Sequence, residues 1–373
     1  MLDQPPVWLI LLAFVCAIGP LVFFHEMGHY LVGRLFGVGA ETFSIGFGRE
    51  ITGWTDRSGT RWKVGWLPLG GYVRFVGDES HAGEAEGTSS EANPRSFAGK
   101  PVWQRFLIVL AGPMANFLLA IIIFACFFAA WGVPRTPNNV MGVEPGSPAA
   151  AAGIQPGDRI VTVAGQRTPS FEDVQRTVSL RPGEEVTIRV ERDGRTETLQ
   201  TTLGVHVETD RFGQTYRIGR LGFYTTGRQL EKVSAAELVP EAARYTWVLT
   251  VTTMQGLWQI ITGRRPVEEL GGPLKIAQVA GQQASLGLFQ FVQLLALISI
   301  NLGFINLLPV PILDGGHLLF YTVEAIRRRP VSVQAQEWAF RGGLALLVAL
   351  LLFTTLNDLG SFGLWDQLGR LIG

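Results

Sequence analysis

The chain has 373 residues, and its 31 basic residues balance 31 acidic ones, so the formal net charge is zero. Apolar residue types make up 47% of the chain and charged types only 17%, whereas roughly 25% charged residues is usual in a soluble domain. The balanced charge provides no general field for nucleic acid, and the composition is not that of a uniformly soluble enzyme. Cys16 and Cys126 both lie in apolar stretches, which excludes a disulfide scaffold and a cysteine-ligated metal site.

Four uncharged apolar segments predict membrane-spanning helices, because a span needs roughly 20 apolar residues. They are Val7–Phe24, Phe106–Trp131, Leu286–Leu313 and Gly342–Leu356, the last of which must recruit residues from Trp338 onward. No Lys or Arg precedes the first segment and no small-residue cleavage site follows it, so we predict an uncleaved helix rather than a signal peptide.

Basic residues cluster between the first two spans and between the last two. Such loops face the cytoplasm as a rule. We therefore expect the N-terminus, the long segment between spans two and three and the C-terminus to face the opposite side, which is the periplasm if the chain lies in a bacterial inner membrane.

The first span ends in a candidate metal-binding motif, His25-Glu26-Met27-Gly28-His29. On a helix the two histidines fall on one face and can reach the same zinc ion, while Glu26 can take a proton from water. Polar and ionisable residues beside an apolar span are usually functional. The alternative is a juxtamembrane pair of histidines without a metal, packed against a neighbouring part of the chain or facing the cytoplasm. Asn116, a polar residue within the second span, is predicted to form a hydrogen bond between helices.

The segment between spans two and three has the composition of a soluble domain. Residues 142–161, with the sequence GVEPGSPAAAAGIQPGDRIV, resemble a PDZ domain of the bacterial protease type. We place this periplasmic domain at residues 132–204, and it would take up an extended peptide at a strand edge. The alternative is a small β-rich domain without a ligand. Residues 205–285 then form a connector, in which Glu237–Thr262 predicts an amphipathic helix on the outer membrane surface.

The third span contains a candidate for the missing metal ligand. Two histidines leave a catalytic zinc one protein ligand short, and Asp314 ends the apolar segment. Pro309 and Pro311 fit poorly in a helix, so the span must unwind before Asp314. Non-helical backbone at membrane depth is tolerated where it lines a wet cavity, as a metal site requires. His317 is a weaker candidate, because a fourth protein ligand would close the site to water.

Together, the HExxH motif, the N-x-x-P-x-P-x-L-D-G motif beginning at Asn306, the PDZ-like insert and the four spans resemble the site-2 proteases, which are intramembrane zinc metalloproteases. The resemblance is greatest to the bacterial RseP-type enzymes, here with a single PDZ domain. It implies that His25, His29 and Asp314 bind zinc and that Glu26 is the general base. It also implies that Asn306, together with Pro309 and Pro311, contacts substrate.

The same resemblance gives a role to the segment between spans one and two. Its Gly46-Phe47-Gly48 and residues 61–75 resemble a membrane-associated β-hairpin on the cytoplasmic side, with a turn at Pro68–Gly71 and with Gly70 and Gly71 contacting substrate. The alternative is a hairpin with a purely structural role. The expected fold is thus a polytopic helical membrane protein with two helix pairs, residues 1–131 and 286–373, a cytoplasmic β-hairpin and an inserted periplasmic PDZ domain.

The resemblance implies hydrolysis of peptide bonds within the transmembrane segment of a single-span protein, such as an anti-sigma factor or a signal-peptide remnant. The lipid bilayer and a peptide at the PDZ domain are the other expected partners, and no nucleic acid is expected. Two alternatives are a PDZ scaffold without catalysis and a metal transporter. Both leave Glu26 without a purpose, because it is not needed as a ligand and yet occupies the place of a base.

Overall fold

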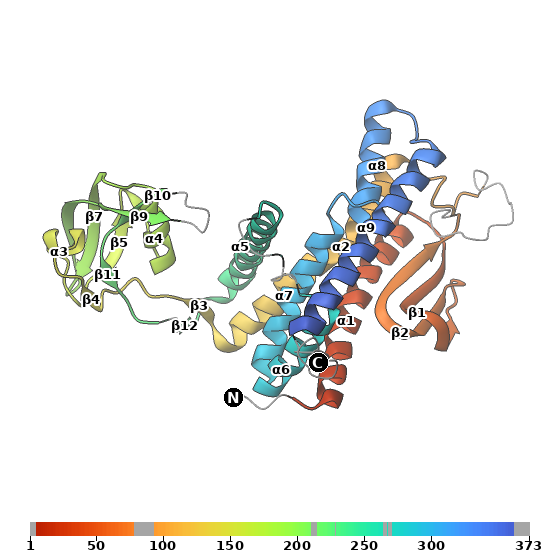
Figure 1. Cartoon of the computed structure of the whole chain (residues 1–373), viewed down its shortest axis with the longest axis horizontal. Helices are drawn as coiled ribbons and strands as arrows, with labels where there is room; N and C mark the ends of the chain where they lie inside the picture. The colour runs from red at the N-terminus through yellow and green to blue at the C-terminus, as the bar shows by residue number, and fades with distance from the viewer. Residues whose placement is uncertain are drawn as a thin grey trace, which may run out of the picture. The chain divides into compact units, whose positions relative to one another are not determined.

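The computed structural model describes residues 5–77, 93–209, 215–227, 229–263, 267 and 271–361 (Figure 1). The chain divides into two compact units. A helical unit comprises Met1–Ala125 and Ala242–Gly373, and a β-domain comprises Cys126–Glu241.

Four helices are long and apolar enough to cross a membrane, which confirms the four predicted segments. They are α1 (Val7–Leu35), α2 (Val102–Trp131), α7 (Leu288–Asn306) and α9 (Val333–Ser361). Helix α1 continues well beyond the uncharged run, so the HExxH motif lies within the same continuous helix as the first span. The backbone of that helix therefore fixes the relative positions of its two histidines.

The predicted break in the third span is confirmed. Helix α7 ends at Asn306, and a new helix, α8 (Asp314–Arg327), begins at Asp314. The intervening residues pack against the first turn of α8, where a Cβ atom on Gly315 or Gly316 would collide with the backbone of residues 307–311. Two successive glycines thus allow the proline-containing linker to place Asp314 at a helix start.

A helix that the sequence analysis did not predict, α6 (Pro273–Leu286), precedes α7. It packs closely on α1, because a Cβ atom on Gly281 would lie 2.6 Å from Cγ1 of Ile10. The N-cap residue, Gly272, has no side chain to cap the helix. The buried carboxylate of Asp358 in α9 does so instead, accepting hydrogen bonds from the backbone N–H groups of Gly272 at 3.0 Å and Lys275 at 2.9 Å.

The connector helix is present as α5 (Ala235–Ile261). Thr246 is buried, and the Thr253 hydroxyl donates to Oδ1 of Asn301 on α7 at 3.3 Å. Its exposed side chains include the apolar Val239, Trp247, Val248, Met254, Trp258 and Ile261 as well as the polar Glu237, Arg244, Gln255 and Gln259. Large apolar side chains thus remain exposed on this helix, as contact with lipid requires. Its position on the outer surface of a membrane stays a prediction.

The hairpin between the first two spans consists of β1 (Ala40–Thr55) and β2 (Arg61–Phe75). Both strands bend, so that Trp62 lies opposite both Phe43 and Trp54. Its ring stacks on Phe43, with centroids 4.4 Å apart, and this aromatic cluster joins the core beneath α1. Residues 68–71 belong to β2, so the predicted turn at Pro68–Gly71 is wrong. The chain instead reverses after Asp56, whose carboxylate accepts hydrogen bonds from Ser58, Thr60 and Trp62.

The β-domain has a four-stranded sheet in the order β6-β5-β7-β8. These strands are β5 (Arg159–Val163), β6 (Gln166–Arg167), β7 (Glu185–Arg192) and β8 (Arg195–Thr202). The sheet buries a core that includes Ile160, Val163, Ile188 and Val190. Two helices accompany it, α3 (Pro148–Ala151) and α4 (Phe171–Ser179), capped by Ser147 and Ser170 respectively.

The β-domain extends beyond residue 204, where the sequence analysis placed its end. Strand β11 (Phe223–Tyr224) pairs with β4 (Gly142–Val143), and β12 (Gln229–Glu231) pairs with β3 (Val133–Arg135). The hairpin of β9 (Gly204–Thr209) and β10 (Thr215–Arg220) lies between β8 and β11 along the chain. The first strands thus find their partners in a segment that the sequence analysis assigned to the connector, because antiparallel pairing joins residues distant in sequence.

Candidate metal centre

Three predicted ligands meet in the helical unit. His25 and His29 come from α1 and Asp314 from the first residue of α8, and one ligand atom of each lies within 4.8 Å of the others. The Asp314 Oδ2 atom lies 3.1 Å from Nε2 of His25 and 3.5 Å from Nε2 of His29. The two Nε2 atoms are 3.3 Å apart. Residues separated by almost 290 positions in sequence therefore point at one small volume.

Small residues allow α2 to approach α1 at this level. A Cβ atom on Gly28 would collide with the backbone oxygen of Ala111, and one on Gly112 would collide with the His29 ring. This close approach lets the carbonyl oxygen of Ile108 accept a hydrogen bond from Nδ1 of His29 at 2.9 Å. The ring of His29 is thereby oriented with its other nitrogen toward His25 and Asp314.

The donor set fits a divalent metal ion. Both histidines are buried, and Asp314 Oδ2 is a buried oxygen without a hydrogen-bond partner among the described residues. Two imidazole nitrogens that face one carboxylate oxygen at these distances form a natural coordination site. Two histidines and one carboxylate are a known ligand set of catalytic zinc, which leaves a fourth position open for water or substrate. Within the described residues, this is the one cluster of three or more such side chains.

Glu26 lies beside the ligands on α1, and its side chain is buried. A Cβ atom on Gly71 would lie 3.1 Å from Cγ of Glu26, so strand β2 runs directly past the candidate base. Gly70 instead faces the ring of Phe47 across the hairpin. Of the two predicted hairpin glycines, the structure thus brings Gly71 to the candidate centre.

The remaining predicted residues lie around the break between α7 and α8. Asn306 is the last residue of α7, and Pro309 and Pro311 lie in the linker that leads to Asp314. Their contact with substrate stays a prediction. His317 is not part of the ligand cluster. Its ring lies 5.2 Å from the ring of Phe340 and 6.4 Å from that of Tyr321, measured between centroids.

One residue of the centre has a role that the sequence analysis missed. The amide nitrogen of Asn116, on α2, lies 3.1 Å from Nδ1 of His25. The prediction of a hydrogen bond between helices is confirmed, but its partner is a candidate metal ligand. The only signal in the sequence is a polar residue in an apolar span, which does not reveal the partner.

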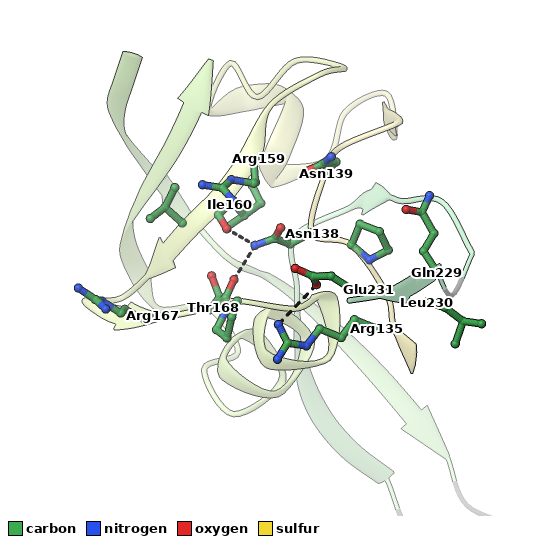
Figure 2. Close-up of a pocket in the computed structure, with 13 residues that line it drawn as sticks. Arg135, Asn138, Asn139, Arg159, Ile160, Arg167, Thr168, Gln229, Leu230 and Glu231 are labelled. Atoms are coloured by element: carbon green, nitrogen blue, oxygen red, sulfur yellow. Dashed lines mark hydrogen bonds and ion pairs between the residues drawn. The ribbon is translucent and has the colours of Figure 1, made fainter. Parts of the chain in front are cut away.

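Several grooves lie within the β-domain. One, of about 760 Å³, lies between β5, β6, β12 and the segment after β3 (Figure 2). There the Asn138 amide donates to the carbonyl oxygens of Ile160 and Thr168, and Arg135 pairs with Glu231. Another groove, of about 370 Å³, is lined by α4 and by residues 218–223. This groove has the arrangement of a helix beside a strand edge that the PDZ prediction requires.

Comparisons with known proteins agree with this centre. Residues 13–350 match Peptidase family M50. The chain is 44% identical over 358 residues to a protein of Agrobacterium fabrum that is named as a zinc metalloprotease, covering 93% of this chain and 95% of that one. It is 37% identical over 393 residues to Metalloprotease MmpA of Caulobacter vibrioides, covering 98% of each. Among solved structures, the PDZ domain of the SdrC-like protein from Listeria monocytogenes matches 25% of this chain and 92% of that domain, at 21% identity and a TM-score of 0.20. Since the family match extends over nearly the whole chain, this protein belongs to peptidase family M50, the site-2 proteases.

Proposed function

We propose that this protein is an intramembrane zinc metalloprotease that hydrolyses peptide bonds within the transmembrane segments of single-span membrane proteins. The observation that carries the proposal is the convergence of His25, His29 and Asp314 beside the buried Glu26. The two histidines belong to α1 and Asp314 follows α7 through the proline-containing linker, and both helices are long and apolar enough to span a membrane. The names of the relatives support zinc as the metal.

Each residue of the centre then has a chemical task. His25, His29 and Asp314 would hold the zinc ion, which, when bound, acidifies water toward a pKa of about 7 and polarises a carbonyl group. The Glu26 carboxylate accepts a proton from the attacking water and passes it to the nitrogen of the leaving amine. Burial of Glu26 keeps that proton away from bulk solvent. The linker around Pro309 and Pro311 leaves non-helical backbone near Asp314, and such backbone is tolerated at membrane depth where it lines a wet cavity, which the reaction requires.

The position of strand β2 supports binding of the substrate as an extended strand beside Glu26. A peptide bond within a helix is shielded, so the substrate segment must become extended before it is cut. Because Gly71 lies against the side chain of Glu26, a substrate strand added along this part of β2 would lie close to the base. Asn306, the last residue of α7, belongs to the motif that contains Asp314. Its side chain would bind the same extended segment of the substrate.

The β-domain supports a role in substrate access. Its groove between α4 and residues 218–223 would receive an extended peptide by pairing with a strand edge. We place the β-domain, the N-terminus and the C-terminus in the periplasm and the β-hairpin at the cytoplasmic face of a bacterial inner membrane, from the distribution of basic residues. Substrates of this kind include an anti-sigma factor trimmed by another protease, whose cleavage would activate a stress response, and signal-peptide remnants.

The full chain reconstituted in lipid vesicles tests the proposal against its alternatives. We expect about one zinc ion per chain, cleavage of a single-span reporter inside its membrane segment, loss of cleavage after chelation and recovery on adding zinc. Mass spectrometry of the products locates the cut. A zinc-loaded chain that binds the reporter without cutting it would indicate a scaffold, and zinc flux across the vesicle membrane without cleavage would indicate a transporter.

A further inference from the structure

Helix α2 contacts both candidate histidine ligands at the ring nitrogen that faces away from the metal position. Nδ1 of His29 is hydrogen-bonded to the carbonyl oxygen of Ile108, a pure acceptor. Nδ1 of His25 lies 3.1 Å from the side-chain amide of Asn116, and within the described residues this amide is its hydrogen-bond partner. Asn116 is fully buried, and its Oδ1 atom has no hydrogen-bond partner there.

The chemistry of the imidazole decides which end of that amide must face His25. A neutral histidine that binds a metal through Nε2 carries its proton on Nδ1. That N–H group needs an acceptor, as the Ile108 oxygen provides for His29. An amide nitrogen cannot accept, but rotation of the amide by 180° exchanges its nitrogen and oxygen at nearly the same positions. The orphaned Oδ1 atom then meets the N–H group of His25.

We propose that Asn116 is a positioning residue of the metal centre, whose amide oxygen accepts the Nδ1–H hydrogen bond of His25 and holds Nε2 toward His29 and Asp314. The inference rests on the proposed zinc site and adds a residue that the HExxH and LDG motifs do not contain. Helix α2 thus orients both histidines, through one backbone carbonyl and one side-chain amide eight residues later. Partners of this kind typically change metal affinity by about 10- to 100-fold.

The neighbourhood of Asn116 offers a matched control. The Ser299 hydroxyl of α7 donates to the backbone carbonyl of Asn116 at 2.8 Å. Ser299 is fully buried at the same position between α2 and α7. Replacing it with Ala removes a hydrogen bond between these two helices without removing a partner of His25. It therefore measures what loss of contact between the helices does by itself.

The test compares Asn116→Leu, Asn116→Asp and Ser299→Ala in the full chain in detergent micelles. Leu has the branched shape of Asn, is larger and offers no acceptor, whereas Asp keeps an acceptor oxygen. Zinc affinity is measured by competition with a chromophoric chelator, and the absorption spectrum of the cobalt-substituted chain reports ligand geometry. In the metal-free chain, nitrogen chemical shifts of ¹⁵N-labelled histidine report which ring nitrogen of His25 carries the proton.

We expect Asn116→Leu to lower zinc affinity about 10- to 100-fold, to alter the cobalt spectrum and to shift the His25 proton toward Nε2. Asn116→Asp and Ser299→Ala should stay within a few-fold of the unmodified chain. Unchanged affinity and unchanged nitrogen shifts in Asn116→Leu would overturn the proposal, as would equal losses in Asn116→Leu and Ser299→Ala. An unmodified chain that binds zinc but cuts no substrate would contradict the proposed protease and leave this comparison intact, whereas one that binds no zinc would overturn both.

Discussion

Nδ1 of His29 lies 2.9 Å from the carbonyl oxygen of Ile108, so a candidate metal ligand on α1 is oriented by the backbone of α2. This contact depends on the close approach of the two helices. Gly28 on α1 and Gly112 on α2 both lie where a Cβ atom would collide with the facing helix. The candidate metal centre therefore depends on residues that carry no chemistry of their own.

Gly112→Ala should reduce zinc affinity by roughly tenfold or more, because the added methyl group would meet the His29 ring and overpacking typically costs about 1–3 kcal/mol. Zinc competition with a chelator measures the effect. Gly19→Ala is the matched control, since Gly19 lies in α1 and a Cβ atom there would meet nothing within 4 Å. Equal affinity in the two variants would show that the approach of α2 does not constrain the ligand.

Glu26→Gln should keep zinc and lose at least about 100-fold in the rate of cleavage, because the ligands remain while no carboxylate accepts the proton of the attacking water. Metal content and the turnover of a single-span reporter are measured on the same preparation. Near-normal turnover by the zinc-loaded variant would show that Glu26 is not the base.

Asp314→Ala should lower zinc occupancy strongly, because it removes one of the three atoms that converge at the centre. His317→Ala should leave occupancy nearly unchanged, since that ring packs near Phe340 and Tyr321 outside the cluster. Metal analysis after dialysis against a weak chelator compares the two. The reverse ranking would move the third ligand from Asp314 to His317.

Asp158 should stabilise the β-domain in a pH-dependent manner. Burial raises the pKa of its carboxyl, but hydrogen bonds from Arg192 at 2.7 and 2.8 Å and from the backbone of Gln155 outweigh burial and hold the pKa below its ordinary value. A depressed pKa means that the stabilisation is complete above the unfolded-state value of about 4 and is lost as pH falls through the folded-state value. Hydrogen exchange of β5 and β7 in the full chain should therefore show lower protection below about pH 4.

Asp158→Asn should weaken the same protection at neutral pH by roughly 2 kcal/mol, because hydrogen bonds to charged groups contribute about 1.5–3 kcal/mol each. Glu191→Gln is the control in the adjoining position, where an exposed ion pair with Arg159 should contribute less than about 1 kcal/mol. Equal losses of protection in the two variants would show that the buried Asp158 carboxylate stabilises the β-domain no more than the exposed ion pair does.

Removal of the β-domain should change which substrates are cut without changing zinc binding. The deletion must cover residues 133–231, because β11 and β12 pair with β4 and β3 and a cut at residue 204 would leave strands without partners. One transmembrane segment with a short or a long periplasmic extension serves as the paired substrate. We expect the deleted chain to cut the long form more readily than the intact chain does. Unchanged discrimination in a folded, zinc-loaded deletion variant would show that the domain is not a filter.

The sequence by itself determined the elements whose signals are local. Uncharged segments long enough to cross a bilayer predicted the four spans, and the spacing of His25 and His29 places both on one helical face whatever surrounds them. Pro309 and Pro311 predicted the break before Asp314, because two prolines so close together remove two backbone donors, whereas the single Pro20 and Pro113 lie within the continuous helices α1 and α2. These features could be predicted because they depend only on residue type and on spacings of a few residues along the chain.

Only the tertiary structure decided what depends on contacts between distant segments. The partner of Asn116, the approach of Gly112 to His29 and the cap that Asp358 gives to α6 all join residues on different helices. The end of the β-domain was misplaced for the same reason, since β3 and β4 pair with strands about 80 to 100 residues later. Such partners are selected by packing and by the satisfaction of buried polar groups, which no local pattern encodes.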